Sequence, residues 1–270
     1  MTTGDKIRKN RKEKGYSQEQ LAELLGVSFQ AVSSWERDEF LPETGRLKEL
    51  CRILDMSPSY LLRDDAELDT QKELFDWKRM KTFIKTSAKN YGLRECAKAL
   101  DYAEEAHKNQ LRKKSDTPYI YHPFNMTCHL LAMGIREDDI LAATLLHDVV
   151  EDCGEKAEDL PFSEEVKHLV SLLSFDKGSR KSRKEKLDEY YERIGKDPKA
   201  SLIKCTDRCN NLTTMAWGLD VSRQLRMIRE SEEYILPLLK VVKKEPAYND
   251  AAWLLTYQIE SMLEIYKNLL

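Results

Sequence analysis

The sequence has few of the residues that interrupt regular structure, and its cysteines form no recognisable cross-linking pattern. Glycine and proline number only 10 and 8 among 270 residues, below their usual shares of about 7% and 5%. The six cysteines include no C-x-x-C pair, so neither a disulfide framework nor a zinc ribbon is indicated. Alternating apolar and polar stretches and internal repeats are also absent. The sequence therefore predicts an all-α protein.

Long apolar runs and an excess of positive charge are missing as well. The most apolar stretch, ILAATLLHDVV at residues 140–150, contains a histidine and an aspartate, and it is too short and too polar to span a membrane. The basic N-terminus lacks the apolar segment of a secretory signal. The formal net charge is −3, so a nucleic-acid site would have to be local. We expect a cytoplasmic protein with about two domains.

Short helical patterns separated by single turns fill residues 1–64. Ser17 and Gln20 have the spacing of a capping box, and Gly26 follows the last apolar residue of the helix they begin. The segment SQEQLAELLGVSFQAVSSWERDEFLPETGRLKEL resembles a lambda-repressor-like, Xre-type helix-turn-helix domain. The resemblance implies five helices and binding of double-stranded DNA. A homodimer is expected because one recognition helix reads too few base pairs for useful affinity.

The same resemblance implies which residues of this domain contact DNA. One lies at the start of the second helix and faces phosphate, and the others lie on or just before the third helix and face the major groove. These residues are Gln18, Ser28, Phe29, Gln30, Ser33 and Ser34. Gln30 could make a two-point contact to adenine, whereas Phe29 is apolar where many relatives have a polar base reader. The alternative is a helical bundle that contacts other proteins.

The rest of the chain is also helical in pattern. Residues 65–80 are rich in charge and have only a sparse apolar stripe, which favours a helical connector. Residues 81–270 form a long series of helical patterns with a few short breaks. The sequence thus predicts a second, larger helical domain over 81–270.

Four potential metal ligands occur in this second domain. They are His122 in YIYHP, His147 and Asp148 in LLHDVVED, and Asp207 in KCTDRCNN. Neutral imidazole and carboxylate together suit a divalent cation and leave positions open for water and substrate. The core of a helical bundle can bring such distant ligands together.

Two further carboxylates follow the His-Asp pair in an apolar stretch. We expect one helix to carry them all, with Glu151 four residues after His147 and Asp152 four residues after Asp148. An unpaired acid is costly to bury. Such residues are therefore candidates for positioning or deprotonating the attacking water, or for protonating the leaving group.

Three sequence blocks resemble the HD superfamily of metal-dependent phosphohydrolases. They are AHKNQLRKKSDTPYIYHP, AATLLHDVVEDC and IKCTDRCNNL. More narrowly, they are similar to the hydrolase domain of the Rel/Spo stringent-response enzymes and the small alarmone hydrolases. The fold implied is an HD-type helical bundle over 81–270.

The resemblance implies a role for each matched residue. His122, His147, Asp148 and Asp207 would hold one metal ion, with Mn²⁺ the family's usual ion and other divalent ions possible, and Glu151 and Asp152 would manage the nucleophilic water. The substrate-binding residues would be Arg112, Lys113, Asn211 and Thr214. The reaction implied is release of pyrophosphate from the 3′ position of the guanine nucleotide alarmone (p)ppGpp.

Departures from the family pattern leave alternatives open. Asn109 replaces a glycine of the first block, and Thr213 stands where the family has an arginine. An HD phosphohydrolase acting on another nucleotide is therefore one alternative. A transcription regulator that senses a nucleotide through an HD fold is another. Bifunctional relatives carry a synthetase domain after the hydrolase domain, and synthesis is not expected here.

Overall fold

The computed structural model describes residues 1–62, 76–112, 117–175, 178 and 181–270. Within these ranges the protein is helical and contains no strand. A single isolated bridge joins Leu111 and Pro118. The expected all-α class is confirmed. The chain divides into two compact units, and each unit is considered by itself.

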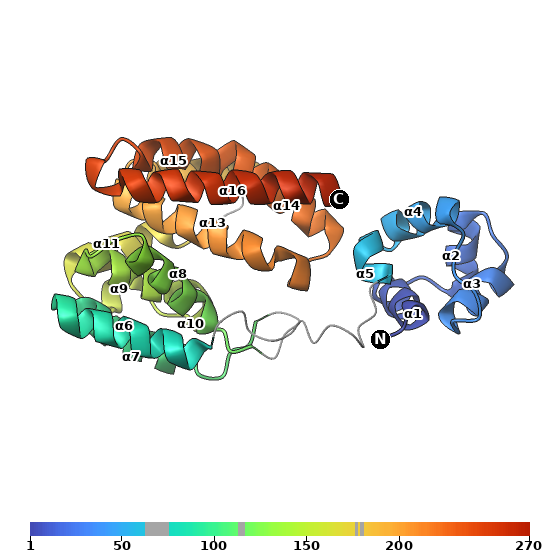
Figure 1. Ribbon diagram of the computed structural model, residues 1–270, viewed down its shortest axis with the longest axis horizontal. Helices are drawn as coiled ribbons and strands as arrows, with labels where there is room; N and C mark the ends of the chain where they lie inside the picture. Colours follow the sequence, from blue (N-terminus) through green and yellow to red (C-terminus); the bar gives the residue numbers. More distant parts are fainter. Residues whose placement is uncertain (63–75, 113–116, 176–177, 179–180) are drawn as a thin grey trace. The chain divides into compact units, whose positions relative to one another are not determined.

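The described N-terminal residues of the smaller unit, 1–62, form five helices, as expected. They are α1 (Thr3–Glu13), α2 (Gln18–Leu25), α3 (Phe29–Glu36), α4 (Thr44–Ile53) and α5 (Pro58–Leu62) (Figure 1). Their apolar faces meet in one core, in which Leu21, Val32, Leu50 and Leu61 are fully buried. This burial removes the apolar face of each short helix from water, which is what stabilises helices of this length.

Local signals in the sequence set the ends of these helices. Ser17 accepts a hydrogen bond from the Gln20 N–H and the Gln20 side chain accepts one from the Ser17 N–H, so the expected capping box is present. Gly26 ends α2 with φ 61°, a left-handed conformation that glycine adopts without steric cost. Ser28 then caps α3 by accepting from the Ala31 N–H.

The chain after residue 76 forms a second series of helices. The α-helices are α6 (Trp77–Tyr91), α7 (Arg94–Ala106), α8 (Tyr121–Ala132), α9 (Asp138–Leu146), α10 (Val149–Cys153), α11 (Glu164–Leu173), α12 (Arg183–Ile194), α13 (Pro198–Gly218), α14 (Val221–Glu230), α15 (Leu236–Val242) and α16 (Asn249–Leu269). Three short elements accompany them, η1 (Ala157–Asp159), the π-helical turn η2 (Ser231–Ile235) and η3 (Pro246–Tyr248). The larger unit contains these elements apart from residues 219–226.

Helix α8 has a central place in the larger unit. It packs against α6, α9 and α13, while α9 also packs against α7 and α11 (Figure 1). On the other side, α13 packs against α15 and α16. Phe124, Met126 and Leu130 of α8 are fully buried between these neighbours. This arrangement brings the start of α8, the end of α9 and the middle of α13 together.

One expectation about the local structure is wrong. His147 and Asp148 do not lie on a continuous helix with Glu151, because α9 ends at Leu146 and α10 begins at Val149. The His147 ring donates from Nδ1 to the carbonyl of Thr144 at 2.8 Å, which satisfies one of the carbonyl groups that a helix end leaves unpaired. Neighbouring residues on a helix point about 100° apart, whereas the turn brings both side chains to the same site.

The connector expected over residues 65–80 falls largely outside the described residues. Of this segment, α6 begins at Trp77, and Met80 is already buried in the larger unit. The domain limits of 1–64 and 81–270 therefore remain predictions.

Candidate metal centre

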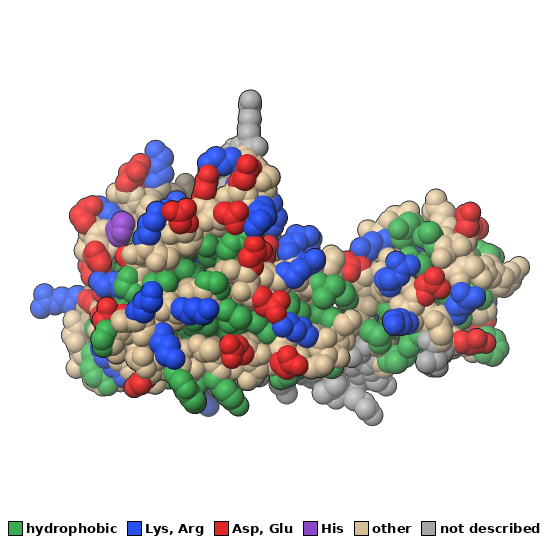
Figure 2. Space-filling model, turned by 90° about the horizontal axis from the view of Figure 1, so that it is seen from above, with side chains coloured by type: hydrophobic (Ala, Val, Ile, Leu, Met, Phe, Trp, Pro, Cys, Tyr) green, Lys and Arg blue, Asp and Glu red, His purple; other side chains and the backbone are tan. Residues whose placement is uncertain are grey.

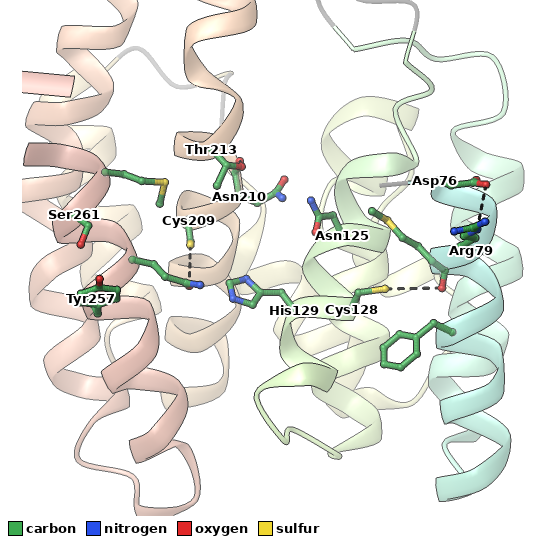
Figure 3. A pocket seen from close by; sticks show the side chains of 14 residues that line it. Asp76, Arg79, Asn125, Cys128, His129, Cys209, Asn210, Thr213, Tyr257 and Ser261 are labelled. Carbon is green, nitrogen blue, oxygen red and sulfur yellow. Dashed lines mark hydrogen bonds and ion pairs between the residues drawn. The ribbon is translucent and has the colours of Figure 1, made fainter. Parts of the chain in front are cut away.

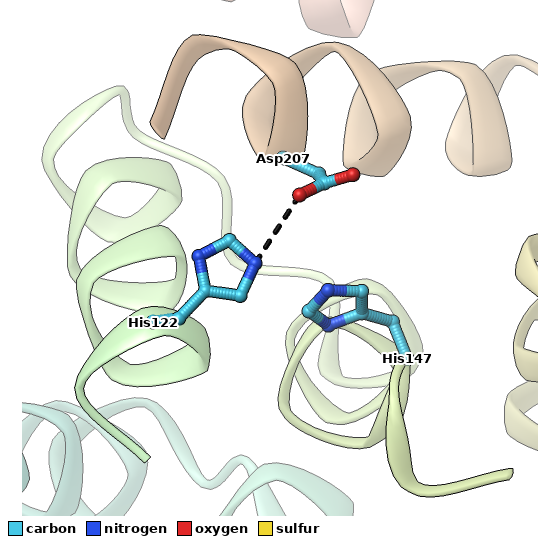
Figure 4. A group of neighbouring side chains, drawn as sticks. All are labelled: His122, His147 and Asp207. Carbon is cyan, nitrogen blue, oxygen red and sulfur yellow. Dashed lines mark ion pairs between the residues drawn. The ribbon is translucent and has the colours of Figure 1, made fainter. Parts of the chain in front are cut away.

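Three of the four expected metal ligands meet in one buried cluster. His122 comes from the first turn of α8, His147 from the turn after α9, and Asp207 from the middle of α13. One ligand atom from each lies within 4.8 Å of the others. Figure 4 shows the two rings and the carboxylate converging, with 3.2 Å between His122 Nε2 and Asp207 Oδ1. The cluster could hold a divalent cation.

Both rings are oriented so that Nε2 faces this cluster. His122 Nδ1 donates to the side-chain oxygen of Asn210 at 2.5 Å, and His147 Nδ1 donates to the carbonyl of Thr144 at 2.8 Å. Because carbonyl oxygens only accept, Nδ1 carries the proton and Nε2 can offer its lone pair. His147 Nε2 is buried, and Asp148 Oδ2 lies 3.0 Å from it. These features fit a metal ion between the rings.

Asp148, whose side chain is 22% exposed, adjoins the buried cluster. Its Oδ2 lies 3.0 Å from His147 Nε2 and 3.9 Å from His122 Nε2. The same oxygen accepts a hydrogen bond from the Tyr119 hydroxyl at 2.5 Å. Its role as a fourth ligand remains a prediction.

Positively charged groups stabilise the ionised carboxylate of Asp207, the third candidate ligand. Burial opposes ionisation of Asp207, but Lys204 and the two histidines outweigh it and hold the pKa of this carboxyl well below its ordinary value. Lys204 Nζ donates to Asp207 Oδ2 at 2.8 Å, and Asn211 Nδ2 donates to Oδ1 at 2.6 Å. The carboxylate is therefore ionised, as a metal ligand must be.

The protonation of His147 bears directly on metal binding. Burial disfavours its charged form, but the carboxylates of Asp148 and Asp207 outweigh burial and raise the pKa of His147 to about 9. The ring without a metal ion is therefore protonated at neutral pH. Binding of a cation to Nε2 must then release that proton.

Two of the expected substrate residues contact each other, although they are far apart in the sequence. Arg112 Nη2 donates to Thr214 Oγ1 at 3.2 Å. Its Nη1 is buried and has no hydrogen-bond partner among the residues that the structure describes, an arrangement that costs free energy unless a ligand supplies an acceptor. Lys113 lies outside the described residues. Asn211 contacts Asp207, and its expected contact with the nucleotide remains a prediction.

The two expected acids take different positions. Glu151 Oε1 accepts a hydrogen bond from the Phe175 N–H at 2.8 Å. Asp152 is exposed, and its backbone carbonyl accepts from Gln110 Nε2 at 3.4 Å. Their roles with the nucleophilic water remain predictions.

In the smaller unit, the expected DNA-contact residues gather around α3. Gln30 is exposed and Phe29 is 40% exposed. Ser33 and Ser34 are half-buried and both accept hydrogen bonds from Arg37, while the Ser28 hydroxyl caps the helix. The contacts themselves are untested, and each of these residues remains a candidate.

Gln18 belongs to a network that the sequence did not reveal. Its Nε2 donates to Glu36 Oε2 at 2.7 Å. Arg11 binds the same buried carboxylate with two contacts, at 2.5 Å to Oε1 and 3.0 Å to Oε2. Arg11 is therefore used in tying α1 to α3, and the exposed positive charge of α1 is smaller than its sequence suggests.

Sequence reasoning also missed the residues that orient the candidate metal ligands. Asn210 holds His122, Tyr119 holds Asp148, and Lys204 holds Asp207. All three lie within five residues of a ligand and inside the quoted blocks. A polar residue that flanks a candidate ligand in an otherwise apolar stretch was the available signal.

Comparison with protein families agrees with this geometry. A model described as HD domain matches residues 99–233, half of the chain. The chain belongs to the HD-domain family. A helix-turn-helix model matches residues 7–61, ahead of the HD domain. Both expected resemblances are confirmed.

Relatives of the HD domain include Rel/SpoT proteins. Over 147 residues the chain is 37% identical to a protein named probable GTP pyrophosphokinase of Mycobacterium leprae, covering 52% of this chain and 18% of that protein. It is 33% identical over 149 residues to guanosine-3′,5′-bis(diphosphate) 3′-pyrophosphohydrolase of Aquifex aeolicus, covering 53% of this chain and 21% of that one. The chain thus spans about a fifth of the length of these relatives.

A solved structure resembles about two thirds of this chain. It is described as a metazoan ortholog of SpoT that hydrolyzes ppGpp, with a TM-score of 0.51 and 26% sequence identity. The alignment covers 66% of this chain and 97% of that chain. Finally, no helix in the described part of the chain is long and apolar enough to cross a membrane.

Proposed function

We propose that the protein is a metal-dependent (p)ppGpp 3′-pyrophosphohydrolase with an N-terminal domain that binds double-stranded DNA. The cluster of His122, His147 and Asp207 supports this proposal most directly, because both rings present Nε2 to one point beside an ionised carboxylate. A bound divalent ion would lower the pKa of its water and polarise a phosphate oxygen. The relatives' names supply the substrate class.

The chain's own residues would bind and orient the nucleotide. The unpaired Nη1 of Arg112 offers a hydrogen bond to a phosphate or base oxygen, and its charge makes such a bond stronger than a neutral one. Thr214 accepts a hydrogen bond from Nη2 of the same guanidinium and so helps to hold it in place. Tyr119 donates to Asp148 and so holds that carboxylate beside the histidines. Glu151 and Asp152 would orient the attacking water or move its proton.

The identity of the metal ion, the cellular setting and the homodimer are proposed on general chemical grounds. Mn²⁺ suits two imidazoles and a carboxylate, although other divalent ions also accept this ligand set. The six free cysteines are consistent with a reducing, cytoplasmic setting. A homodimer would let two copies of α3 read two half-sites of one operator.

A hydrolysis assay tests the proposed activity. Purified protein with Mn²⁺ is expected to release pyrophosphate from ppGpp, and His147→Ala is expected to abolish release. His168→Ala, which removes an exposed histidine of α11, is the control and should retain activity. Failure of the wild-type protein to hydrolyse ppGpp with Mn²⁺, Mg²⁺, Co²⁺ or Zn²⁺ would refute the proposal. Hydrolysis of other nucleotides in the same panel would instead support an HD phosphohydrolase of different specificity.

A nucleotide-sensing transcription regulator is the second candidate. It is favoured by the contact of Glu151 with the Phe175 N–H, which occupies one oxygen of an acid expected to serve catalysis. The test is binding of DNA selected from a random pool, measured with and without ppGpp. A nucleotide-dependent change in affinity that persists in Glu151→Gln would support sensing. Equal affinity with and without the nucleotide would exclude it.

A further inference from the structure

The start of α3 in the smaller unit presents an apolar side chain beside an amide. Phe29 and Gln30 are the first two residues of this helix, and both are exposed, Phe29 by 40%. The core of the smaller unit takes Val32 and Trp35 from α3 and does not include Phe29. Packing within the unit therefore does not require an aromatic residue at this position.

The other four candidate DNA contacts already use polar side-chain atoms within the unit. These residues are Gln18, Ser28, Ser33 and Ser34. Arg37, which donates to the last two, is itself held by Glu39 through hydrogen bonds of 2.8 and 2.9 Å. Gln30, by contrast, makes no side-chain hydrogen bond within the described residues. Phe29 and Gln30 are therefore the candidates best placed to contact bases.

The edges of base pairs offer a partner for each of these two side chains. The N-terminal residues of a recognition helix approach the base edges in the major groove. The apolar group that distinguishes a base there is the 5-methyl group of thymine, whereas the amide of a glutamine matches N6 and N7 of adenine. Consecutive helical residues rise by only about 1.5 Å, so Phe29 and Gln30 can reach neighbouring base pairs.

The N-terminal residues have no excess of positive charge with which to attract phosphates. Residues 1–62 contain ten lysines and arginines and ten aspartates and glutamates. Two of the basic side chains pair with acids of the unit, Arg11 with Glu36 at 2.5 Å and Lys14 with Asp55 at 3.2 Å. Figure 2 shows charges of both signs mixed over the face of this unit that it draws. Because sequence-independent binding to DNA comes from phosphate contacts, contacts to bases should supply a larger share of the affinity here.

We propose that Phe29 recognises the 5-methyl group of a pyrimidine base and so determines the DNA specificity at one position of the site. This inference rests on the proposed DNA binding and names the feature of the DNA that is read. Thymine and 5-methylcytosine both carry this methyl group at the same place in the major groove. Removing one methyl group from water against the aromatic ring changes the affinity about four-fold.

Removal of a single methyl group from the DNA tests the proposal. The full chain first selects its site from a random pool of duplexes, and fluorescence anisotropy then measures the affinity after each thymine in turn is replaced by deoxyuridine. At one position the replacement should weaken binding of the wild-type chain about four-fold. Phe29→Ala should bind the thymine and uracil duplexes equally. Phe40→Ala removes another exposed aromatic side chain, between α3 and α4, and as the matched control should keep the preference for thymine.

Cytosine and 5-methylcytosine at the same position identify the source of the methyl group. A gain of about four-fold on methylation of the cytosine would support recognition of the methyl group in both bases. No gain, together with the thymine preference, would support thymine as its only source.

Photocrosslinking gives a measurement that needs no variant. Thymine at the sensitive position is replaced by 5-iododeoxyuridine, which carries iodine in place of the methyl group, and irradiation should crosslink this base to Phe29, as mass spectrometry would show. A crosslink to another residue would overturn the proposal. So would an affinity that uracil leaves unchanged at every position, or a thymine preference that survives in Phe29→Ala. Failure to select any DNA would instead refute the proposed DNA binding itself.

Discussion

Asn210 should control how tightly the protein holds its metal ion. Its side-chain oxygen accepts the Nδ1 proton of His122 at 2.5 Å and so fixes the ring with Nε2 toward Asp207. The variant Asn210→Ala removes the acceptor, and the ring can then rotate or change tautomer. Both changes withdraw a ligand from the metal without altering any residue that binds it directly.

The size of the effect follows from the position of Asn210 behind the ligand. Loss of a residue that orients a metal-binding histidine weakens metal affinity about 10- to 100-fold, which corresponds to about 1.4–2.7 kcal/mol. His147 keeps its own support, because its Nδ1 donates to a backbone carbonyl that the substitution leaves in place. The site should therefore be weakened but still present.

Activity measured against metal concentration is the direct assay. Asn210→Ala should need 10- to 100-fold more Mn²⁺ for half-maximal activity, and kcat should return toward the wild-type value at saturating metal. The control is Asn125→Ala, which removes another amide from the groove between α6, α8, α13 and α16 that Asn210 also lines (Figure 3). This variant should leave the metal requirement unchanged. An unchanged requirement in Asn210→Ala, or a loss of kcat that metal does not restore, would refute this reasoning.

Three further predictions concern protonation, substrate binding and stability. The pKa of His147 is raised to about 9, so metal binding at pH 7 should release about one proton per ion. Calorimetry of metal binding in buffers of different ionisation enthalpy measures this release. Equal binding heats in all buffers would contradict the prediction. Arg112→Ala should lower kcat/KM for ppGpp about 10-fold or more by removing a charged donor, whereas Thr214→Val should cost less; equal kinetics for Arg112→Ala and wild type would count against the contact. Glu36→Ala should destabilise the smaller unit by about 3–5 kcal/mol because it leaves the charge of Arg11 buried alone, as chemical denaturation would show. Burial opposes ionisation of Glu36, but Arg11 and Gln18 lower its pKa below the ordinary 4.5, so this stabilisation is complete above pH of about 4.5 and is lost as pH falls through the folded-state value; a stability that stays constant down to pH 3 would contradict it.

Local rules account for most of the smaller unit. The Ser17 capping box, Gly26 and Ser28 mark the ends of α2 and α3, and these signals act within a few residues. The buried contact of Arg11 with Glu36 could not be predicted in this way. It joins residues 25 positions apart, and in the sequence Arg11 is one of several similar basic residues of the first helix.

The candidate metal centre was also only partly predictable from the sequence. Residue type and matching blocks predicted His122, His147 and Asp207 as metal ligands, because metal chemistry restricts the choice of ligands, and the structure brings these three side chains together. The turn at His147 was missed, because neither glycine nor proline marks it. The turn is stabilised by the hydrogen bond from the His147 ring to the Thr144 carbonyl. The spacing of apolar residues along the sequence gives no information about such a side-chain contact.

Anomalous diffraction from crystals of the full chain grown with MnCl₂ would test the central claim most directly. The account predicts one strong peak bonded to Nε2 of His122, Nε2 of His147 and a carboxylate oxygen of Asp207. A peak at other residues, or none at these three under saturating Mn²⁺, would contradict it.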